Sequence, residues 1–443
     1  MAAGKSVLLV AALAHAVAAS AAGVAAKPTA AAPGLMAGAA RVDITPSKAD
    51  LPKPFTTIHD HLFVRAVVLD DGASRAAIVV ADLPTIAPDV FEDLRRRIAA
   101  EARVPLSNVL LAVTHTHNAV RLDRNPIGII IPGSAKITDD TSRIIIDAVR
   151  QAAGHLEPAR AGYAEGTTNM IGGGDRAPAG RPSPVPIASV TPDKTLGVLR
   201  IETTDGEPIA LLVNSALEPI MQMPAKTEVS ADLAGATQRY VEQRYGDRAV
   251  VLYTVGSQSS GAYSARARQG VPAGDPGPLT EAVGTILGED VLALAAKTRT
   301  SAAIRVAGAM RTIRCPGKET TPYNLPDRCS DAPDAALPRC DFRDRDIDPV
   351  ALQVGVLRIG DTTLVQADAN ITQPVWQRVK GGTPQGTILV NLMFGPMHYV
   401  VQDSDYPANT YQVTASTAKQ GCAAQGFADA VTGLFAELSS GPG

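Results

Sequence analysis

The stretch from Val109 to His117 constrains the fold of this chain more than any other. Its first five residues, Val109 to Val113, are all apolar and indicate a strand buried on both faces, as in α/β sheets. The run ends abruptly at Thr114-His115-Thr116-His117. Two histidines at i and i+2 on a strand face the same side, and open α/β sheets bind ligands beyond the carboxyl ends of their strands. The pattern predicts a metal or acid–base site, with a pair of structural histidines as the alternative.

The residues on either side of this stretch predict an α/β domain with a mixed β-sheet core and flanking helices. Residues 62–70 and 76–82 are apolar runs joined by the turn Asp71-Gly72, which predicts a β-hairpin. Apolar residues at helical spacing in 88–104 predict a helix that leads into the histidine strand. Further helices are expected at 141–156, 230–245, 278–296 and 414–438, and further strands at 37–46, 195–201, 209–213, 250–255, 354–359, 363–367 and 388–392. Residues 160–190 are rich in Gly and Pro and are expected to form a loop.

Composition and the amino-terminal sequence indicate a compartment and exclude some partners. The 443 residues carry a net charge of −3 without a basic cluster, which argues against nucleic acid or an anionic membrane as partner. Residues 1–26 are typical of a signal peptide, 27–36 form an Ala/Pro-rich leader, and 37–443 form one domain. We therefore expect a secreted or periplasmic protein without a stable membrane anchor, whose oligomeric state the sequence leaves open.

The cysteines fit an oxidising compartment. The chain has four of them, and none lies in a Cys-x-x-Cys metal-binding pattern, so disulfides are the expected use. The sequence leaves three pairings open for Cys315, Cys329, Cys340 and Cys422.

Several stretches, in the same order along the chain, resemble the neutral/alkaline (non-lysosomal) ceramidase family. The most specific is Asn108-Val-Leu-Leu-Ala-Val-Thr-His-Thr-His117, which is similar to that family's Thr-His-Thr-His-Ser-Gly-Pro motif. Others are Gly38-Ala-Ala-Arg-Val-Asp-Ile-Thr-Pro46, Arg65-Ala-Val-Val-Leu-Asp-Asp71 and Val79-Val-Ala-Asp-Leu83. The resemblance covers most of the chain after the leader, but not the carboxyl-terminal immunoglobulin-like domain of full-length ceramidases. It implies a ceramidase-like α/β catalytic domain and a zinc amidase that cleaves the N-acyl bond of ceramide.

The resemblance also implies a set of site residues. His115 matches the first metal ligand, Tyr399 matches a late tyrosine ligand, and His117 matches the neighbour that contacts the reacting amide. Positions that match substrate-binding or reacting residues of the family are Arg176, Ser259 and Tyr411.

Two ligand positions depart from the family pattern. Glu218-Pro219 stands where the family has His-Pro, so the second ligand is expected to be a carboxylate, which zinc accepts. Asp368-Ala369-Asn370 stands where the family has Pro-Gly-Glu, so the third ligand position is occupied by Asn370, with Asp368 as a substitute.

The expected function is hydrolysis of an amide bond in a small or lipid-like N-acyl substrate. Water activated by zinc would attack the acyl carbonyl, His117 would stabilise the oxyanion or protonate the amine, and Arg176 would hold a head group. Ser259 would assist the water or attack directly. Asp232 is expected to orient a ligand or to cap the following helix.

Three alternatives remain open from the sequence. The first is a secreted protein that kept the fold and binds without catalysis. The second is a hydrolase of another acyl substrate, with a relocated metal site built from the amino-terminal half. The third is a metal-free hydrolase that pairs Ser259 with His398. The residues of the relocated site would be His59, His61, Asp82, His115 and His117.

Overall fold

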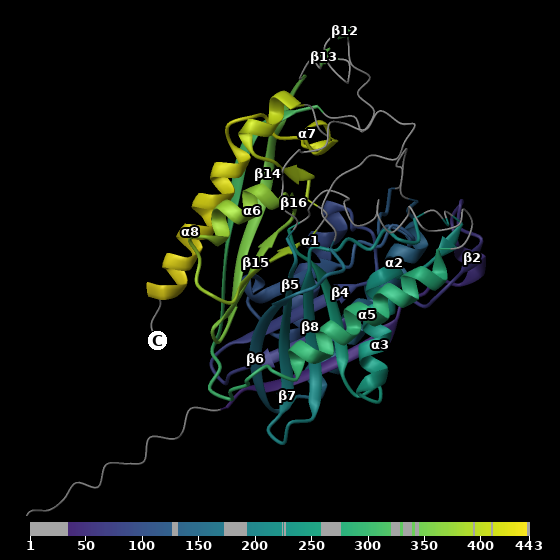
Figure 1. Cartoon of the computed structure of the whole chain (residues 1–443), viewed down its shortest axis with the longest axis vertical. Helices are drawn as coiled ribbons and strands as arrows, with labels where there is room; N and C mark the ends of the chain where they lie inside the picture. Colours follow the sequence, from purple (N-terminus) through teal and green to yellow (C-terminus); the bar gives the residue numbers. More distant parts are fainter. Residues whose placement is uncertain are drawn as a thin grey trace, which may run out of the picture. The chain divides into compact units, whose positions relative to one another are not determined.

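The computed structural model describes residues 34–125, 132–171, 193–223, 225, 227–257, 276–319, 328–330, 339–341, 345–392, 395–408 and 411–440. Its largest sheet has eight strands in the order β10-β8-β7-β6-β1-β3-β4-β5. Figure 1 labels β4, β5, β6, β7 and β8 of this sheet. These strands are β1 (Met36–Asp43), β3 (Phe63–Asp70), β4 (Arg75–Ala81), β5 (Val109–Val113), β6 (Glu157–Thr167), β7 (Thr195–Thr203), β8 (Pro208–Ser215) and β10 (Val250–Val255). The outermost pairs, β10–β8 and β4–β5, are parallel, and the pairs between them are antiparallel.

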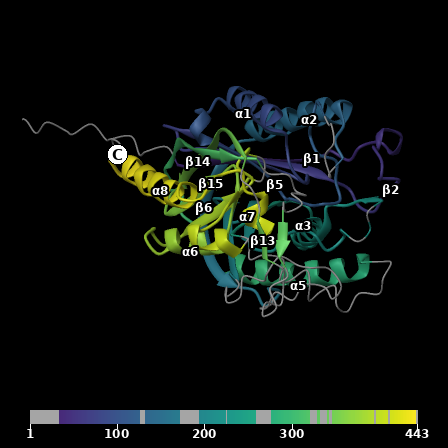
Figure 2. The same cartoon turned by 90° about the horizontal axis from the view of Figure 1, so that it is seen from above.

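This sheet consists of two halves that are weakly joined. Only two residue pairs link β1 to β6, whereas nine link β6 to β7. The half with β1, β3, β4 and β5 packs against helices α1 (Pro88–Ala102) and α2 (Ala135–Gly154). The half with β6, β7, β8 and β10 packs against α3 (Asp232–Arg244) and α5 (Gly277–Ala295). Figure 2 shows the two helix pairs on opposite sides of the strands, and this confirms the α/β class with a mixed sheet and flanking helices.

A second sheet has the order β11-β14-β15-β17, with α8 packed across β11 and β14. Its elements are β11 (Val306–Lys318), β14 (Asp346–Ile359), β15 (Thr362–Ala367), β17 (Thr387–Asn391), α6 (Gln373–Lys380), α7 (Tyr411–Ala415) and α8 (Ala423–Ser440). Three short pairs complete the described strands: β2 (Thr57–Ile58) with β9 (Glu228–Val229), β12 (Arg328–Ser330) with β13 (Arg339–Asp341), and β16 (Asn370–Ile371) with β18 (Tyr399–Val400). Short 3-10 helices occupy Lys48–Asp50, Leu106–Asn108 and Asp403–Ala408. None of the helices in the described part of the chain is long and apolar enough to cross a bilayer.

Most expected elements are confirmed, and two expectations are wrong. The first residues of the expected 160–190 loop belong to β6, whose small residues carry little β signal. Gly162 is needed there, since a Cβ atom would lie 1.9 Å from the carbonyl oxygen of Arg299. The single expected helix at 414–438 is instead α7 and α8. Gly421 lies between them with φ +96°, which an α-helix cannot accommodate.

A disulfide between Cys315 on β11 and Cys422 just before α8 ties the terminal helix to the second sheet. Their sequence separation is 107 residues, and their Cα atoms are 5.7 Å apart. The backbone of Cys329 lies opposite that of Cys340 in the β12–β13 pair, and no cysteine in the described part of the chain is free.

We expect the double variant Cys315→Ser/Cys422→Ser to lose about 2–4 kcal/mol of unfolding free energy, because the unfolded chain regains the freedom of a long closed loop. Urea unfolding of wild type and variant under oxidising conditions measures this. Equal stability of the two proteins would contradict the prediction.

Candidate metal centre

His115 is held in an uncommon backbone conformation where β5 ends. Its φ is +63°, in the left-handed region that a non-glycine residue occupies only at a cost. Its N–H donates to the carbonyl of Leu83, and its Nδ1 lies 2.6 Å from the carbonyl oxygen of Pro84. Because a carbonyl only accepts, Nδ1 carries the proton and Nε2 presents its lone pair to the site. Such a carbonyl partner is the usual outer contact of a histidine that binds a metal.

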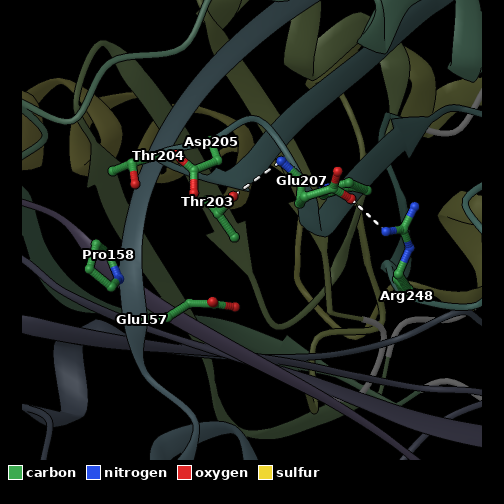
Figure 3. A pocket seen from close by; sticks show the side chains of 8 residues that line it. Glu157, Pro158, Thr203, Thr204, Asp205, Glu207 and Arg248 are labelled. Atoms are coloured by element: carbon green, nitrogen blue, oxygen red, sulfur yellow. Dashed lines mark hydrogen bonds and ion pairs between the residues drawn. The ribbon is translucent and has the colours of Figure 1, made fainter.

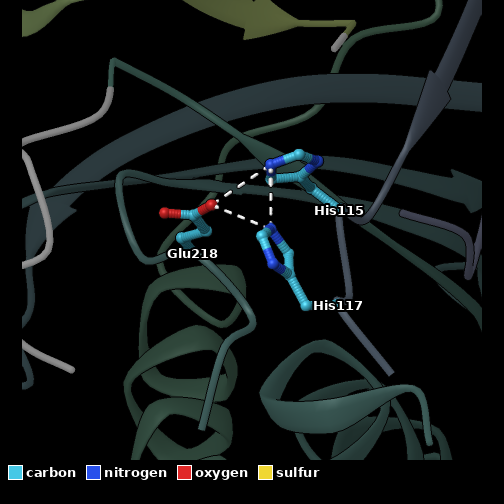
Figure 4. Close-up of side chains that lie close together, drawn as sticks. All are labelled: His115, His117 and Glu218. Carbon is cyan, nitrogen blue, oxygen red and sulfur yellow. Dashed lines mark hydrogen bonds and ion pairs between the residues drawn. The ribbon is translucent and has the colours of Figure 1, made fainter. Parts of the chain in front are cut away.

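His117 and Glu218 bring two further donor atoms to Nε2 of His115 (Figure 4). Oε1 of Glu218 lies 3.1 Å from Nε2 of His115 and 3.4 Å from Nε2 of His117. The two histidine Nε2 atoms are 3.3 Å apart, with ring planes at 89°. Glu218 follows β8, so the two halves of the large sheet each contribute to the site.

These separations fit a single metal ion. Ligands at about 2.0–2.1 Å from a tetrahedral zinc ion are about 3.3 Å from one another. The three measured separations lie close to that value. Two histidines and one glutamate are also an established donor set of zinc hydrolases with an open position. Within the described residues, these are the only histidine, cysteine and acidic side chains that gather in a group able to hold a metal.

Without a metal, Glu218 and His115 shift each other's pKa. Burial by itself lowers the pKa of His115, but the hydrogen bond and charge of Glu218 outweigh it and raise that pKa above its ordinary value. Burial by itself raises the pKa of Glu218, but hydrogen bonds and charge from both histidines hold it well below its usual range. The site therefore favours a positive charge at the place that a cation would take.

Two other expected ligands, Asn370 and Tyr399, lie opposite each other on two short paired strands. Asn370 on β16 and Tyr399 on β18 are register partners in a parallel pair. Nδ2 of Asn391 donates to Oδ1 of Asn370 at 3.3 Å and to the carbonyl of Gly256 at 2.8 Å. The N–H of Gly256 donates to the carbonyl of Ser215, three residues before Glu218. Hydrogen bonds thus connect this pair to the segment that carries Glu218.

Other expected site residues lie elsewhere. Arg176 and Ser259 lie outside the described residues, so the pairing of Ser259 with His398 does too. Asp368 does not gather with the two histidines and Glu218: its Oδ1 accepts the N–H of Gln353, and the charges of Glu92 and Arg95 act on it. Burial raises the pKa of Asp368 to about 7. Asp368 is therefore wrong as a substitute ligand.

The relocated amino-terminal metal site is also wrong. Nδ1 of His61 pairs with Asp43 at 2.6 Å, and His59 lies beside Glu228 at 3.8 Å. Asp82 binds the guanidinium of Arg65 at 2.9 Å. Each of these side chains has a partner other than the two histidines of the site.

A surface pocket lies at the other end of β8 (Figure 3). Its lining residues are Glu157, Pro158, Thr203, Thr204, Asp205, Glu207, Pro208 and Arg248. Arg248 is paired with Glu207 at 2.7 Å, and none of the site residues takes part. The pocket is therefore separate from the candidate metal centre.

The sequence predicted that His115 and His117 face one site, and the structure shows a different cause for their arrangement. Alternation along a strand was the expected cause, but β5 ends at Val113, and the left-handed turn at His115 sets the ring orientation. The carbonyl of Pro84 had no signal in the sequence, because any residue supplies a carbonyl.

Solved structures with a similar fold exist, whereas no family model matches the sequence. Neutral ceramidase from Pseudomonas aeruginosa superposes with a TM-score of 0.70 at 16% identity, covering 91% of this chain and 75% of that one. A ceramidase complexed with C2 gives 0.71 at 16% identity, with 91% and 76% covered. The chain therefore has the fold of the neutral ceramidases.

Proposed function

We propose that this protein is a metal-dependent hydrolase of an acyl bond, with an N-acyl amide as its first candidate substrate. The observation that carries the proposal is the convergence of His115, His117 and Glu218, with separations of 3.1–3.4 Å between their donor atoms. The ceramidase fold supports a lipid-like or small N-acyl substrate. Zinc is the first candidate ion, because the donor set and spacing suit it.

The residues of this chain have distinct roles in the proposal. A bound divalent ion supplies Lewis-acid polarisation of the acyl carbonyl and activation of water. His115 and Glu218 hold the ion, and His117 is the third donor; contact with the reacting amide is its alternative role. Asn370 and Tyr399 are proposed as further ligands, and Arg176 and Ser259 as substrate-binding and reacting groups. A chain with this fold and no activity would be a binding protein instead.

We further propose that the protein acts outside the cytoplasm. The disulfide between Cys315 and Cys422 supports this, since such bonds persist in oxidising compartments. The signal peptide at 1–26 is part of the same proposal, and the amino-terminal sequence of the protein recovered from its host would test it.

The central test is metal content followed by activity. We expect the purified wild-type chain to hold about one zinc per molecule by elemental analysis, as three converging donors predict. Removing the metal with a chelator should abolish hydrolysis of short-chain N-acyl substrates, and zinc should restore it. A folded chain that binds no divalent ion would overturn the proposal. A chain that holds zinc but cleaves none of these substrates would favour the binding protein.

Metal affinity should depend on pH in a direction set by His115. Its pKa is raised in the metal-free chain, so below that pKa a metal must displace a proton. The association constant is therefore expected to rise about tenfold per pH unit until the pH passes the pKa of His115, and then to level off. Competition with a chelator across pH 5–9 (roughly the range in which His titrates) measures it. An affinity that does not change with pH would contradict a proton at His115.

A further inference from the structure

Three consecutive residues, Ser230, Ala231 and Asp232, contact both chain segments that carry the metal donors. We call them the 230–232 clamp. On one side, the carbonyl of Ser230 accepts the hydroxyl of Thr116 at 2.7 Å, and its N–H donates to the carbonyl of Asn118, also at 2.7 Å. Thr116 lies between the two histidines of the site. The clamp therefore fixes the histidine segment at two points.

On the other side, the carboxylate of Asp232 holds the segment after Glu218. Its Oδ1 accepts the N–H of Met221 at 3.1 Å, and its Oδ2 accepts the N–H of Gln222 at 2.7 Å. Asp232 is only 1% exposed and has φ +55°, so an unusual backbone conformation directs its side chain at this loop. Its Oδ1 also accepts the N–H of Leu233, the second residue of α3, at 2.5 Å. These contacts are compatible with both roles expected for Asp232, because its carboxylate holds the segment after Glu218 and also an N–H of the first turn of α3.

Asp60 holds the clamp itself in place. Its Oδ2 accepts the hydroxyl of Ser230 at 2.6 Å, and its Oδ1 accepts the N–H of Ala231 at 2.8 Å. The same hydroxyl oxygen of Ser230 accepts the N–H of Asp232 at 2.9 Å. Asp60 therefore binds the side chain of Ser230 and the backbone of Ala231 at the same time, and these contacts restrain the clamp.

We propose that Asp232 is a positioning residue, which sets the distance from Glu218 to His115 and His117 through the backbone of Met221 and Gln222. This inference rests on the proposed function, since a metal is what makes the distance matter. Outer contacts of this kind orient metal ligands, and their loss typically lowers metal affinity about 10–100-fold. The 230–232 clamp can set this distance because it binds both the histidine segment and the segment after Glu218.

Asp232→Asn tests the proposal, because an amide accepts only at its single oxygen and leaves at least one of the three N–H groups bound by Asp232 without its acceptor. The matched control is Asp71→Asn. Asp71 is also a buried aspartate (2% exposed), and it accepts the N–H groups of Ala73, Ser74 and Val306 at 2.7–2.8 Å. It lies in the β3–β4 turn, at the other end of β4 from the site. Both variants should unfold more easily, but only Asp232→Asn should raise the zinc Kd, by about 10–100-fold.

A second variant and a second readout keep the test decisive. If Asp232→Asn fails to fold, Thr116→Val provides the test. It removes the hydroxyl contact with Ser230 and should also weaken zinc binding. Hydrogen exchange at the amides of Met221 and Gln222 should accelerate in Asp232→Asn and stay slow in Asp71→Asn, with or without metal. Unchanged zinc affinity in Asp232→Asn, or unchanged exchange at both amides, would overturn the positioning role. A wild-type chain that binds no zinc overturns the proposed function instead.

Discussion

Replacing His115 by alanine is expected to remove bound metal and hydrolysis together. The substitution deletes one of three donors, so the zinc Kd should rise by more than the roughly 100-fold that loss of an outer contact costs. Hydrolysis should fall about 10³-fold or more, since the ion contributes several kcal/mol to the transition state. Elemental analysis of the purified variant and initial rates on an N-acyl substrate measure the two effects.

The left-handed backbone at His115 provides a matched control. His115→Gly deletes the same imidazole and also removes the Cβ atom. A Cβ atom at φ +63° destabilises the folded chain by about 1–2 kcal/mol. Both variants should lose the metal, while the glycine variant should melt at a higher temperature than the alanine variant. Loss of metal would then not be a consequence of unfolding. Retention of about one zinc per chain in both variants would show that His115 is not a ligand.

Glu218→Gln tests whether metal binding needs the negative charge of Glu218 or only the size of its side chain. The amide keeps the size of the side chain but removes the negative charge that holds the pKa of His115 above its ordinary value. Weaker zinc binding is expected, together with some loss of stability, because the mutual pKa shifts of Glu218 and His115 favour the folded chain. The comparison also tests the carboxylate that stands where ceramidases have a histidine.

The sequence predicted local structure well where one residue type dominates. The apolar runs of β4, β5 and β10 and the helical spacing in α1 are confirmed, because burial on both faces or on one helix face leaves a clear period. The start of α2 was missed, since it begins at Ala135 with Ser134 as its amino-terminal cap. β6 was missed because Ala and Gly are there for close packing, and that need arises only when another segment lies against the strand.

The candidate site also has features that the sequence predicted and features that it could not predict. His115 and His117 are neighbours in sequence, so their convergence was predictable, and resemblance to ceramidases added Glu218. The contact of Glu218 with both histidines depends on how the two halves of the large sheet pack, which no local pattern encodes. The carbonyl of Pro84 and the amides of Met221 and Gln222 are backbone groups, and their role follows from chain path alone.

Disrupting a buried ion-pair network between the two half-sheets is expected to lower the stability of the protein strongly. Arg65 on β3 is 1% exposed, and its guanidinium contacts Asp82 at 2.9 Å and Glu242 of α3 at 3.0 Å. Glu242 also accepts the N–H of Val251 on β10 at 3.1 Å. Arg65→Met leaves buried Asp82 without its cation and leaves Glu242 with Arg41 alone, so the unfolding free energy should fall by about 3–5 kcal/mol. Urea unfolding at pH 7 measures it.

Arg41 is the natural control, because it binds the same glutamate from a more exposed position. Its side chain is 30% exposed, and Glu242 keeps Arg65 as its partner in Arg41→Met, so this variant should cost less than Arg65→Met. The triple variant Arg65→Met/Asp82→Asn/Glu242→Gln should regain most of the stability lost in Arg65→Met, since the charges are then gone. If Arg65→Met costs no more than Arg41→Met, the network does not hold the half-sheets together. If the triple variant is as unstable as Arg65→Met, the loss comes from packing around the stem of the arginine, and burial of unpaired charge is not its cause.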